Sequence, residues 1–274
     1  MLRIRLLREH LCGQSKKRKA QRDSGCGSEA VAAAVLTNLQ AADALILAEP
    51  DPLPALVKGV SLEAILRRHP APAGAVSTNV QDAYTACGVV VAPFPDGACT
   101  CGAGATAAGA AFANKLTRRG HVSVVFFCDS DANSSWQQAL DFAMTCDLPL
   151  VFIRQSASPF QPARRSQGRR GARSGKAPTL PMIPVDSNDA VAVFRVAHEA
   201  IGHARRGNGP TLIDCVSLRM PGEQAADPIA RMETCLAGRG IRPQKIASKV
   251  AAEFNRTLNA ALKAATRSPR KIGK

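Results

Sequence analysis

Residues 122–153 read VSVVFFCDSDANSSWQQALDFAMTCDLPLVFI, two apolar runs on either side of a polar, helix-prone segment. The first run, Val122–Phe127, is continuous and rich in β-branched and aromatic residues, as expected of a strand buried on both faces of a parallel sheet. A helix is predicted at Ser135–Met144 and a second buried strand at Leu148–Ile153. Strand, turn, helix and strand in this order predict a right-handed βαβ unit.

Ligands of parallel sheets bind outside the carboxyl ends of the strands. The turn after the first strand carries Asp129, and the second strand ends near Ile153. We therefore expect Asp129 and the segment after Ile153 to lie on the same edge of the sheet.

Apolar runs and helix signals extend this pattern in both directions. Further strands are predicted at Ala44–Ala48, around Ile183–Val185 and at Thr211–Val216. Helices are predicted at Glu29–Leu39, Ser61–Arg68, Gly102–Leu116, Ala190–Arg205, Pro228–Leu236 and Lys245–Ala265. These elements predict an α/β fold with a mainly parallel sheet flanked by helices.

Two stretches are predicted to lack helices. The run Glu49–Pro52 is expected to be neither helix nor central strand, because proline lacks the N–H that both ladders need. Residues 70–100 are rich in Pro, Ala, Gly and Val and are predicted to be a loop with one or two short extended pieces.

The chain is expected to divide into a basic N-terminal helix or arm at residues 1–24 and a single α/β domain at residues 25–274. Leucines at helical spacing among the first 22 residues indicate an amphipathic helix. Within the domain, residues 155–181 form a long basic loop without apolar periodicity, and loops of this length are usually functional or disordered.

The formal net charge of +15 suggests a polyanion, an acidic protein or a phosphorylated ligand as partner, although solvated loops are the simpler explanation. Nucleic acid is not expected, because Phe160 is the only aromatic residue of the basic loop, so the loop offers too few rings on which bases could stack. The nine cysteines are odd in number and irregular in spacing, which indicates a reducing cytoplasm. Neither a signal peptide nor a membrane-spanning stretch is expected.

The order of the segments resembles the α subunit of the thiamine-diphosphate-dependent first component of 2-oxo acid dehydrogenases, such as the pyruvate and branched-chain enzymes. The resemblance covers nearly the whole chain and implies a thiamine-diphosphate-binding fold. It is carried by SEAVAAAV (28–35), KGVSLEAIL (58–66), GATAAGAAFANKL (104–116), GPTLIDCVSLRM (209–220) and DPIARMETCLAGRG (227–240).

The cofactor motif of this family opens with Gly-Asp-Gly after a buried strand and closes with Asn-Asn after the next strand. The corresponding opening here is CDSDANSS at residues 128–135. The resemblance implies that Asp129 is the Mg²⁺ ligand and that Asp129, Ser130 and Asn133 contact the cofactor, since Mg²⁺ prefers oxygen ligands. The alternative for Asp129 is a turn aspartate that caps the following helix.

The sequence departs from the family pattern at several cofactor contacts. Cys128 and Ser130 replace the two glycines, and Ser156 and Ala157 replace the asparagines. The acidic run Glu49–Pro52 stands where the family has a Tyr-Arg pair, and Glu223 stands at an expected histidine. Arg219 keeps the family's arginine and is expected to contact the cofactor.

In this family the chemistry belongs to thiamine diphosphate, which supports decarboxylation of a 2-oxo acid and transfer of the acyl group to lipoamide. The α subunit holds the diphosphate and Mg²⁺, and a β subunit completes the site, so no catalytic residue is assigned to this chain. Three functions remain open: a working α subunit within a homo- or hetero-oligomer that includes a β-type chain, a catalytically inactive paralogue with a structural role, and a polyanion-binding protein that uses the basic loop.

Overall fold

The computed structural model describes residues 1–13, 28–47, 51–68, 78–91, 101–128, 134–156, 180–216 and 227–267. Within these residues, six strands form one sheet in the order β2-β1-β3-β4-β6-β5, and every pair is parallel. The strands are β1 (Ala44–Leu47), β2 (Val89–Val91), β3 (Ser123–Cys128), β4 (Leu150–Ser156), β5 (Met182–Asp186) and β6 (Thr211–Val216). The predicted α/β fold with a parallel sheet is confirmed.

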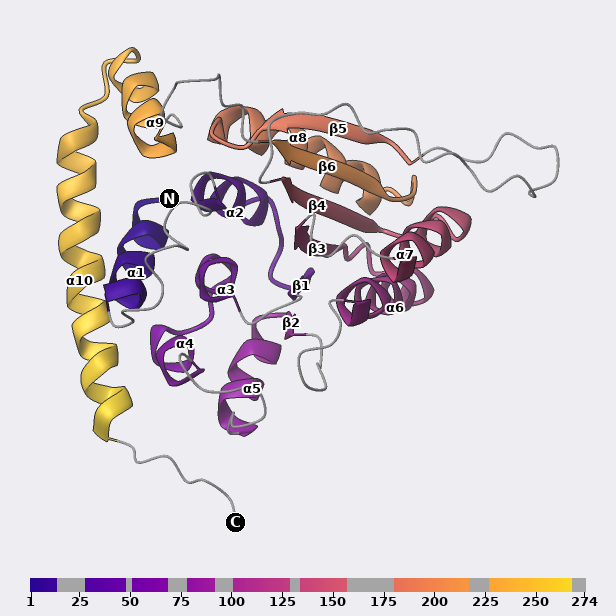
Figure 1. Cartoon of the computed structure of the whole chain (residues 1–274), viewed down its shortest axis with the longest axis horizontal. Coiled ribbons are helices and arrows are strands. Elements are labelled where there is room, and N and C mark those ends of the chain that lie inside the picture. The colour runs from indigo at the N-terminus through magenta and orange to yellow at the C-terminus, as the bar shows by residue number, and fades with distance from the viewer. Residues whose placement is uncertain are drawn as a thin grey trace.

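Helices cover both faces of the sheet (Figure 1). Helices α6 (Cys101–Thr117) and α7 (Ser134–Thr145) contribute to the core on one face. The core on the other face takes residues from seven further helices. These are α1 (Leu2–Gly13), α2 (Ser28–Leu36), α3 (Pro52–Lys58), α4 (Leu62–Arg68), α5 (Thr78–Ala86), α8 (Ala190–Arg205) and α10 (Pro243–Arg267), with α9 (Pro228–Ala237) next to α10.

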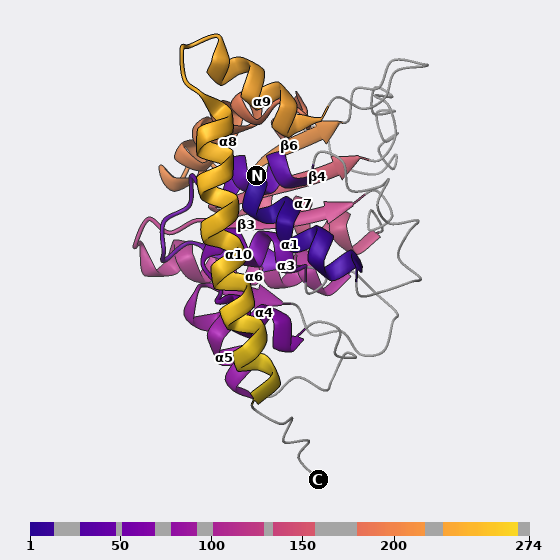
Figure 2. The ribbon, with the colours of Figure 1, turned by 90° about the vertical axis from the view of Figure 1, so that its left-hand side faces the viewer.

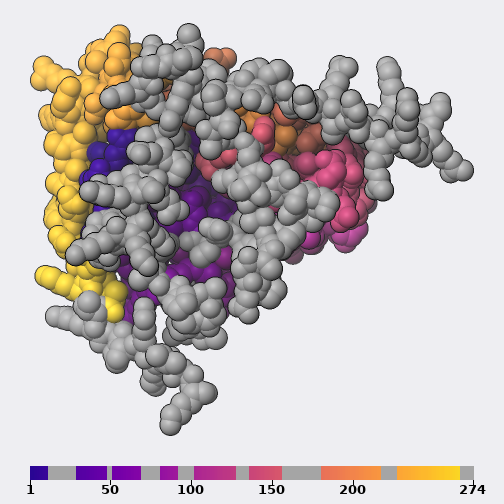
Figure 3. All heavy atoms as spheres, in the orientation of Figure 1, coloured from indigo at the N-terminus to yellow at the C-terminus, as the bar shows by residue number. Residues whose placement is uncertain are grey.

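Strand residues alternate between the two cores, as the pleat of a strand requires. In β3, Val124 and Phe126 point to the face of α8, whereas Val125 and Phe127 point to α6 and α7. The long helix α10 runs along one side of the molecule (Figures 2 and 3) and places Phe254 in the core on the α8 face. The basic helix α1 also belongs to this body, because Ile4 and Leu7 are buried.

The predicted helices and strands around the βαβ unit are confirmed, with ends that shift by a few residues. Helix α8 and strand β6 have the predicted bounds, and β4 extends to Ser156, beyond the predicted end at Ile153. The expected loop at 155–181 therefore begins later, and its residues 157–179 lie outside the described part of the chain.

Two predictions were wrong. The run Glu49–Pro52 was expected to exclude a helix, yet α3 begins at Pro52, with Asp51 as its N-cap. Proline is tolerated in the first helical turn, where its missing N–H would have no intrahelical partner. Residues 70–100 were expected to lack a helix, yet they contain α5, which buries Tyr84 completely.

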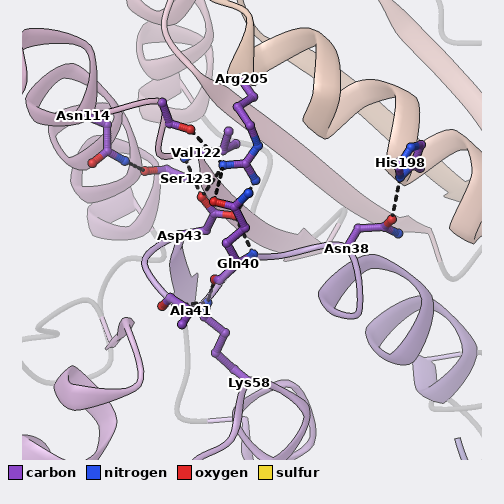
Figure 4. A network of polar contacts seen from close by, with 11 residues as sticks. Asn38, Gln40, Ala41, Asp43, Lys58, Asn114, Val122, Ser123, His198 and Arg205 are labelled. Atoms are coloured by element: carbon purple, nitrogen blue, oxygen red, sulfur yellow. Dashed lines mark hydrogen bonds and ion pairs between the residues drawn. The ribbon is translucent and has the colours of Figure 1, made fainter. Parts of the chain in front are cut away.

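A buried ion pair joins α8 to the amino ends of the central strands (Figure 4). Asp43 is fully buried just before β1 and accepts hydrogen bonds from Nη1 and Nη2 of Arg205 at 3.0 and 2.6 Å. The same carboxylate accepts the backbone N–H groups of Gln40 at 2.8 Å and Val122 at 2.9 Å. Four donors thus satisfy one buried charge and fix α8, β1 and the start of β3 relative to one another.

Among the helices that the structure describes, none combines the length and the apolar character needed to cross a lipid bilayer.

We expect Asp43→Ala to lower the free energy of unfolding by about 3–5 kcal/mol, because it leaves the Arg205 guanidinium without its buried partner. Urea unfolding followed by the fluorescence of Trp136, the single tryptophan, measures this change. The matched control is Glu63→Ala, which removes a partly exposed pair with Arg67 and should cost less than about 0.5 kcal/mol. Equal effects of the two substitutions would contradict the assigned role of Asp43.

Two glycines of α6 should respond oppositely to substitution. A Cβ at Gly104 would lie 3.2 Å from Cβ of Ala139 and 3.4 Å from the Trp136 ring, whereas a Cβ at Gly109 meets nothing within 4 Å. Gly104→Val should lower the free energy of unfolding by about 1–3 kcal/mol by overpacking, and Gly109→Ala should raise it by about 0.5–1 kcal/mol through helix propensity. Thermal unfolding of both variants tests this, and a stabilising Gly104→Val would refute the close α6–α7 contact.

Burial raises the pKa of Tyr84 to about 12 from an ordinary value of 10.0. The Arg68 guanidinium lies 4.9 Å from the ring centre and offsets part of this shift. Since the folded state prefers the neutral phenol, this stability is present below pH 10 and is lost as the pH rises towards 12. Tyr84 is the single tyrosine, so we expect tyrosinate absorbance only near pH 12. Ionisation near pH 10 with the fold intact would contradict its burial.

Candidate functional site

The carboxyl ends of all six strands meet at one edge of the sheet, since every strand pair is parallel. Figure 2 shows β4 and β6 ending on the same side of the molecule. At this edge Cys128 of β3 lies opposite Gln155 of β4, which lies opposite Cys215 of β6. Parallel sheets bind their ligands at this edge, so the candidate site is here.

The residues predicted to contact the cofactor, Asp129, Ser130, Asn133 and Arg219, lie outside the described residues. Their chain neighbours are described. Asp129 directly follows the last residue of β3, and Arg219 belongs to the segment that joins β6 to α9. The predicted roles of these four residues stay predictions.

A charged pair in the two neighbouring strands was not identified from the sequence. Nη1 of Arg154 in β4 lies 3.1 Å from both carboxylate oxygens of Asp214 in β6, and these residues are register partners. The sequence shows one charged residue directly after each of two strand segments: Arg154 after VFI and Asp214 after TLI. Because the partners are 60 positions apart, only the sheet order pairs them.

An aromatic cluster fixes α7 beneath the candidate site. Trp136 in the first turns of α7 stacks on Phe127 of β3 with ring centres 4.3 Å apart, and its edge meets Phe152 of β4 at 6.2 Å. Trp136 is almost fully buried. The segment between β3 and α7, which contains Asp129, therefore starts and ends on packed elements.

Two arginines fix α9, the helix that follows the Arg219 segment. Arg231 donates to Asp186 at 2.7 Å and to Asp189 at 2.8 Å, which ties α9 to the end of β5 and the N-cap of α8. Arg5 of α1 bonds the buried Glu29 and donates to both oxygens of Asp227, the N-cap of α9. The hydrogen bond from Arg5 lowers the pKa of Asp227, so the Arg5–Asp227 pair is charged at neutral pH.

The end of β1 leads into an acidic cap. Oδ1 of Asp51 accepts the backbone N–H of Leu53 at 2.9 Å, so the first turn of α3 is already satisfied by its own carboxylate. A diphosphate at this edge would meet a carboxylate at the end of β1 and the Arg154–Asp214 pair between β4 and β6.

Within the described ranges, no group of three or more His, Cys, Asp or Glu side chains is placed to hold a metal ion. The predicted Mg²⁺ ligand, Asp129, is outside those ranges. Among the described residues at this edge, Arg154 of β4 offers a positive charge that suits an anionic ligand.

A family model described as "Dehydrogenase E1 component" matches residues 2–228, a range that contains all six strands. The α subunit of the acetoin:2,6-dichlorophenolindophenol oxidoreductase of Bacillus subtilis is 35% identical over 127 residues, which cover 44% of this chain and 38% of that protein. The pyruvate dehydrogenase E1 component subunit alpha of Acholeplasma laidlawii is 31% identical over 180 residues, 55% of this chain and 52% of that protein.

A third relative is the 3-methyl-2-oxobutanoate dehydrogenase subunit alpha of Mycobacterium tuberculosis, 30% identical over 168 residues, 53% of this chain and 46% of that protein. The chain thus spans about half the length, or less, of these relatives. The family match, in contrast, covers most of the chain, including the βαβ unit and the strand ends that form the candidate site. The chain belongs to the dehydrogenase E1 component family.

Proposed function

We propose that this chain is the α-type subunit of a thiamine-diphosphate-dependent 2-oxo acid dehydrogenase. The proposed reaction is oxidative decarboxylation of pyruvate or a branched-chain 2-oxo acid, with transfer of the acyl group to lipoamide. The observation that carries the proposal is the family match over residues 2–228, which contains every described strand. Two of the three relatives are named as α subunits of 2-oxo acid dehydrogenases, which supports this activity, and the third is the α subunit of an acetoin oxidoreductase.

Thiamine diphosphate, when bound, supplies the carbanion chemistry of such a reaction. In the proposal, this chain's part is to hold the diphosphate and Mg²⁺ at the carboxyl edge of the sheet. Asp129 follows β3 and is the proposed Mg²⁺ ligand, and Ser130 and Asn133 offer further oxygen atoms from the same segment of the chain. Arg219, after β6, supplies positive charge. No side chain of this chain is assigned a proton transfer.

The chemistry of the described residues fits a diphosphate between β3, β4 and β6 better than at the end of β1. At the end of β1, the Asp51 carboxylate caps α3, and a second negative group there would repel a phosphate. Between β4 and β6, the Arg154 guanidinium is held at the edge by Asp214. We therefore place the proposed cofactor contacts on the β3–β4–β6 side of the edge.

A β-type partner chain is part of the proposal, because an α-type subunit supplies only one side of the site. One surface is suited to such contact: the outer face of α6 and α7 exposes Phe112, Leu116 and Phe142, with the two phenylalanine rings 5.9 Å apart. Exposed large apolar side chains that lie together mark interaction surfaces. Sedimentation velocity of the chain alone and mixed with a β-type subunit measures the association, and a chain that stays monomeric in both would contradict it.

We also propose a reducing, cytoplasmic location. Cys87, Cys146, Cys215 and Cys235 carry free thiols in the described part of the chain, as expected where disulfides do not form. Burial raises the pKa of the Cys215 thiol well above its ordinary value, so this residue behaves as a small apolar core side chain. Thiol labelling of the protein in intact cells, with and without prior reduction, tests this location. We expect the same extent of labelling in both, and labelling that rises after reduction would contradict it.

The proposal is tested by calorimetric titration of the chain with thiamine diphosphate and Mg²⁺, together with a β-type subunit. We expect saturable binding that disappears when the metal is chelated. Asp129→Ala should abolish the Mg²⁺-dependent part of the binding, because a carboxylate ligand is lost. The matched control is Asp141→Ala, on the exposed side of α7, which should bind as the unchanged chain does.

Two outcomes would contradict this account. Binding that is unchanged in Asp129→Ala would remove that residue from the metal site. Absence of any heat with the β-type subunit present would reject the cofactor-binding function and leave the inactive paralogue as the explanation.

A further inference from the structure

Arg154 is unusual among the described strand residues. In the six strands it is the only lysine or arginine, and Asp214 and Asp186 are the only acidic residues. Its partner Asp214 is 5% exposed, and Nη1 of Arg154 lies 3.1 Å from both carboxylate oxygens. A charged pair is therefore embedded within the sheet itself.

The pair lies on the face of the sheet that α6 and α7 cover. Phe152 and Leu212 belong to the core on that face, and two residues later the pleat brings Arg154 and Asp214 to the same side. Across the sheet, Phe127 of β3 is the register partner of Arg154. Arg154 thus sits next to the strand that leads into Asp129, two positions before the end of β4.

The pair is not needed to join the two strands. Strands β4 and β6 are already joined by a parallel ladder over six register pairs, so no additional cross-link is needed there. Replacing a buried ion pair by apolar residues of similar volume is often neutral or stabilising. By contrast, the Asp43–Arg205 pair joins a helix to the sheet and satisfies backbone N–H groups.

The position and chemistry of Arg154 suit an anionic ligand. Parallel sheets bind ligands at the carboxyl edge, where Arg154 lies, and a guanidinium matches the geometry of phosphate oxygens. The two hydrogen bonds to Asp214 hold the Arg154 guanidinium in one orientation. At the same edge, the end of β1 presents the Asp51 carboxylate, so positive charge for a phosphate must come from elsewhere.

We propose that Arg154, oriented by Asp214, binds the diphosphate of thiamine diphosphate. This inference rests on the proposed function and adds a residue that the family motif does not contain. In the family pattern an arginine follows the first strand, where this chain has Glu49–Pro52. We assign the cationic contact to Arg154 instead.

The test compares three ligands on the chain assembled with a β-type subunit: thiamine diphosphate, thiamine monophosphate and thiamine, each with Mg²⁺. Calorimetry gives the affinities, and the fluorescence of Trp136, which packs against Phe127, gives an independent readout that does not depend on turnover. The variant is Arg154→Met. We expect its affinity for thiamine diphosphate to fall about 10- to 100-fold, the loss typical of one hydrogen bond to a charged group, while its affinity for thiamine is unchanged.

Arg154→Met removes the guanidinium that neutralises the buried Asp214 carboxylate, which destabilises the fold. The double variant Arg154→Met/Asp214→Leu removes both charges and should keep the fold. It should show the same selective loss of diphosphate affinity. Arg206→Met is the matched control, because Arg206 is an exposed arginine at the C-terminal end of α8, and it should bind all three ligands normally.

A double variant that folds and binds thiamine diphosphate as tightly as the unchanged chain would overturn the role of Arg154 and leave the proposed function standing. An equal loss of affinity for all three ligands would also overturn it, because the diphosphate would then not be the group that Arg154 contacts. An unchanged chain that binds none of the ligands would overturn both proposals.

Discussion

The parallel direction of all six strands is the constraint on which the rest of this structure depends. It sends every carboxyl end to one edge and every amino end to the other, so the two edges can carry different kinds of residue. At the amino edge, the Asp43 carboxylate accepts hydrogen bonds from the Arg205 guanidinium and from two backbone N–H groups. At the carboxyl edge, the strands lead into the segments that contain Asp129 and Arg219.

The ion pairs of the described residues differ in what they join. Arg205, Arg231 and Arg5 each join a helix to a neighbouring element, and Asp189 and Asp227, which two of them bond, are also helix N-caps. Arg154 and Asp214 instead lie in adjacent strands that the ladder already holds together. An ion pair between two strands that the ladder already joins, at the edge where parallel sheets bind ligands, is the feature of this chain that most directly links its fold to the proposed diphosphate site.

Much of the fold could be predicted from the sequence, because the central strands are continuous apolar runs and α8 has a clear N-cap at Asp189. Helices α3 and α5 could not, for two reasons. The start of α3 depends on Pro52 in its first turn, and the polar sequence of α5 is helical because Tyr84 packs into a core formed by distant residues. The Arg154–Asp214 pair was out of reach for a similar reason, since it exists only once the order β4-β6 is known. For Asp129, Ser130, Asn133 and Arg219, the sequence resemblance is the basis of their assigned roles.

The central claim is that the carboxyl edge between β3, β4 and β6 holds the diphosphate of the cofactor. A crystal structure of the chain with a β-type subunit, thiamine diphosphate and Mg²⁺ tests it most directly. We predict phosphate oxygens within hydrogen-bonding distance of the Arg154 guanidinium and a metal ion bound to the carboxylate of Asp129. A cofactor bound at the end of β1 or at the amino edge, or no cofactor at a saturating concentration, would contradict the account.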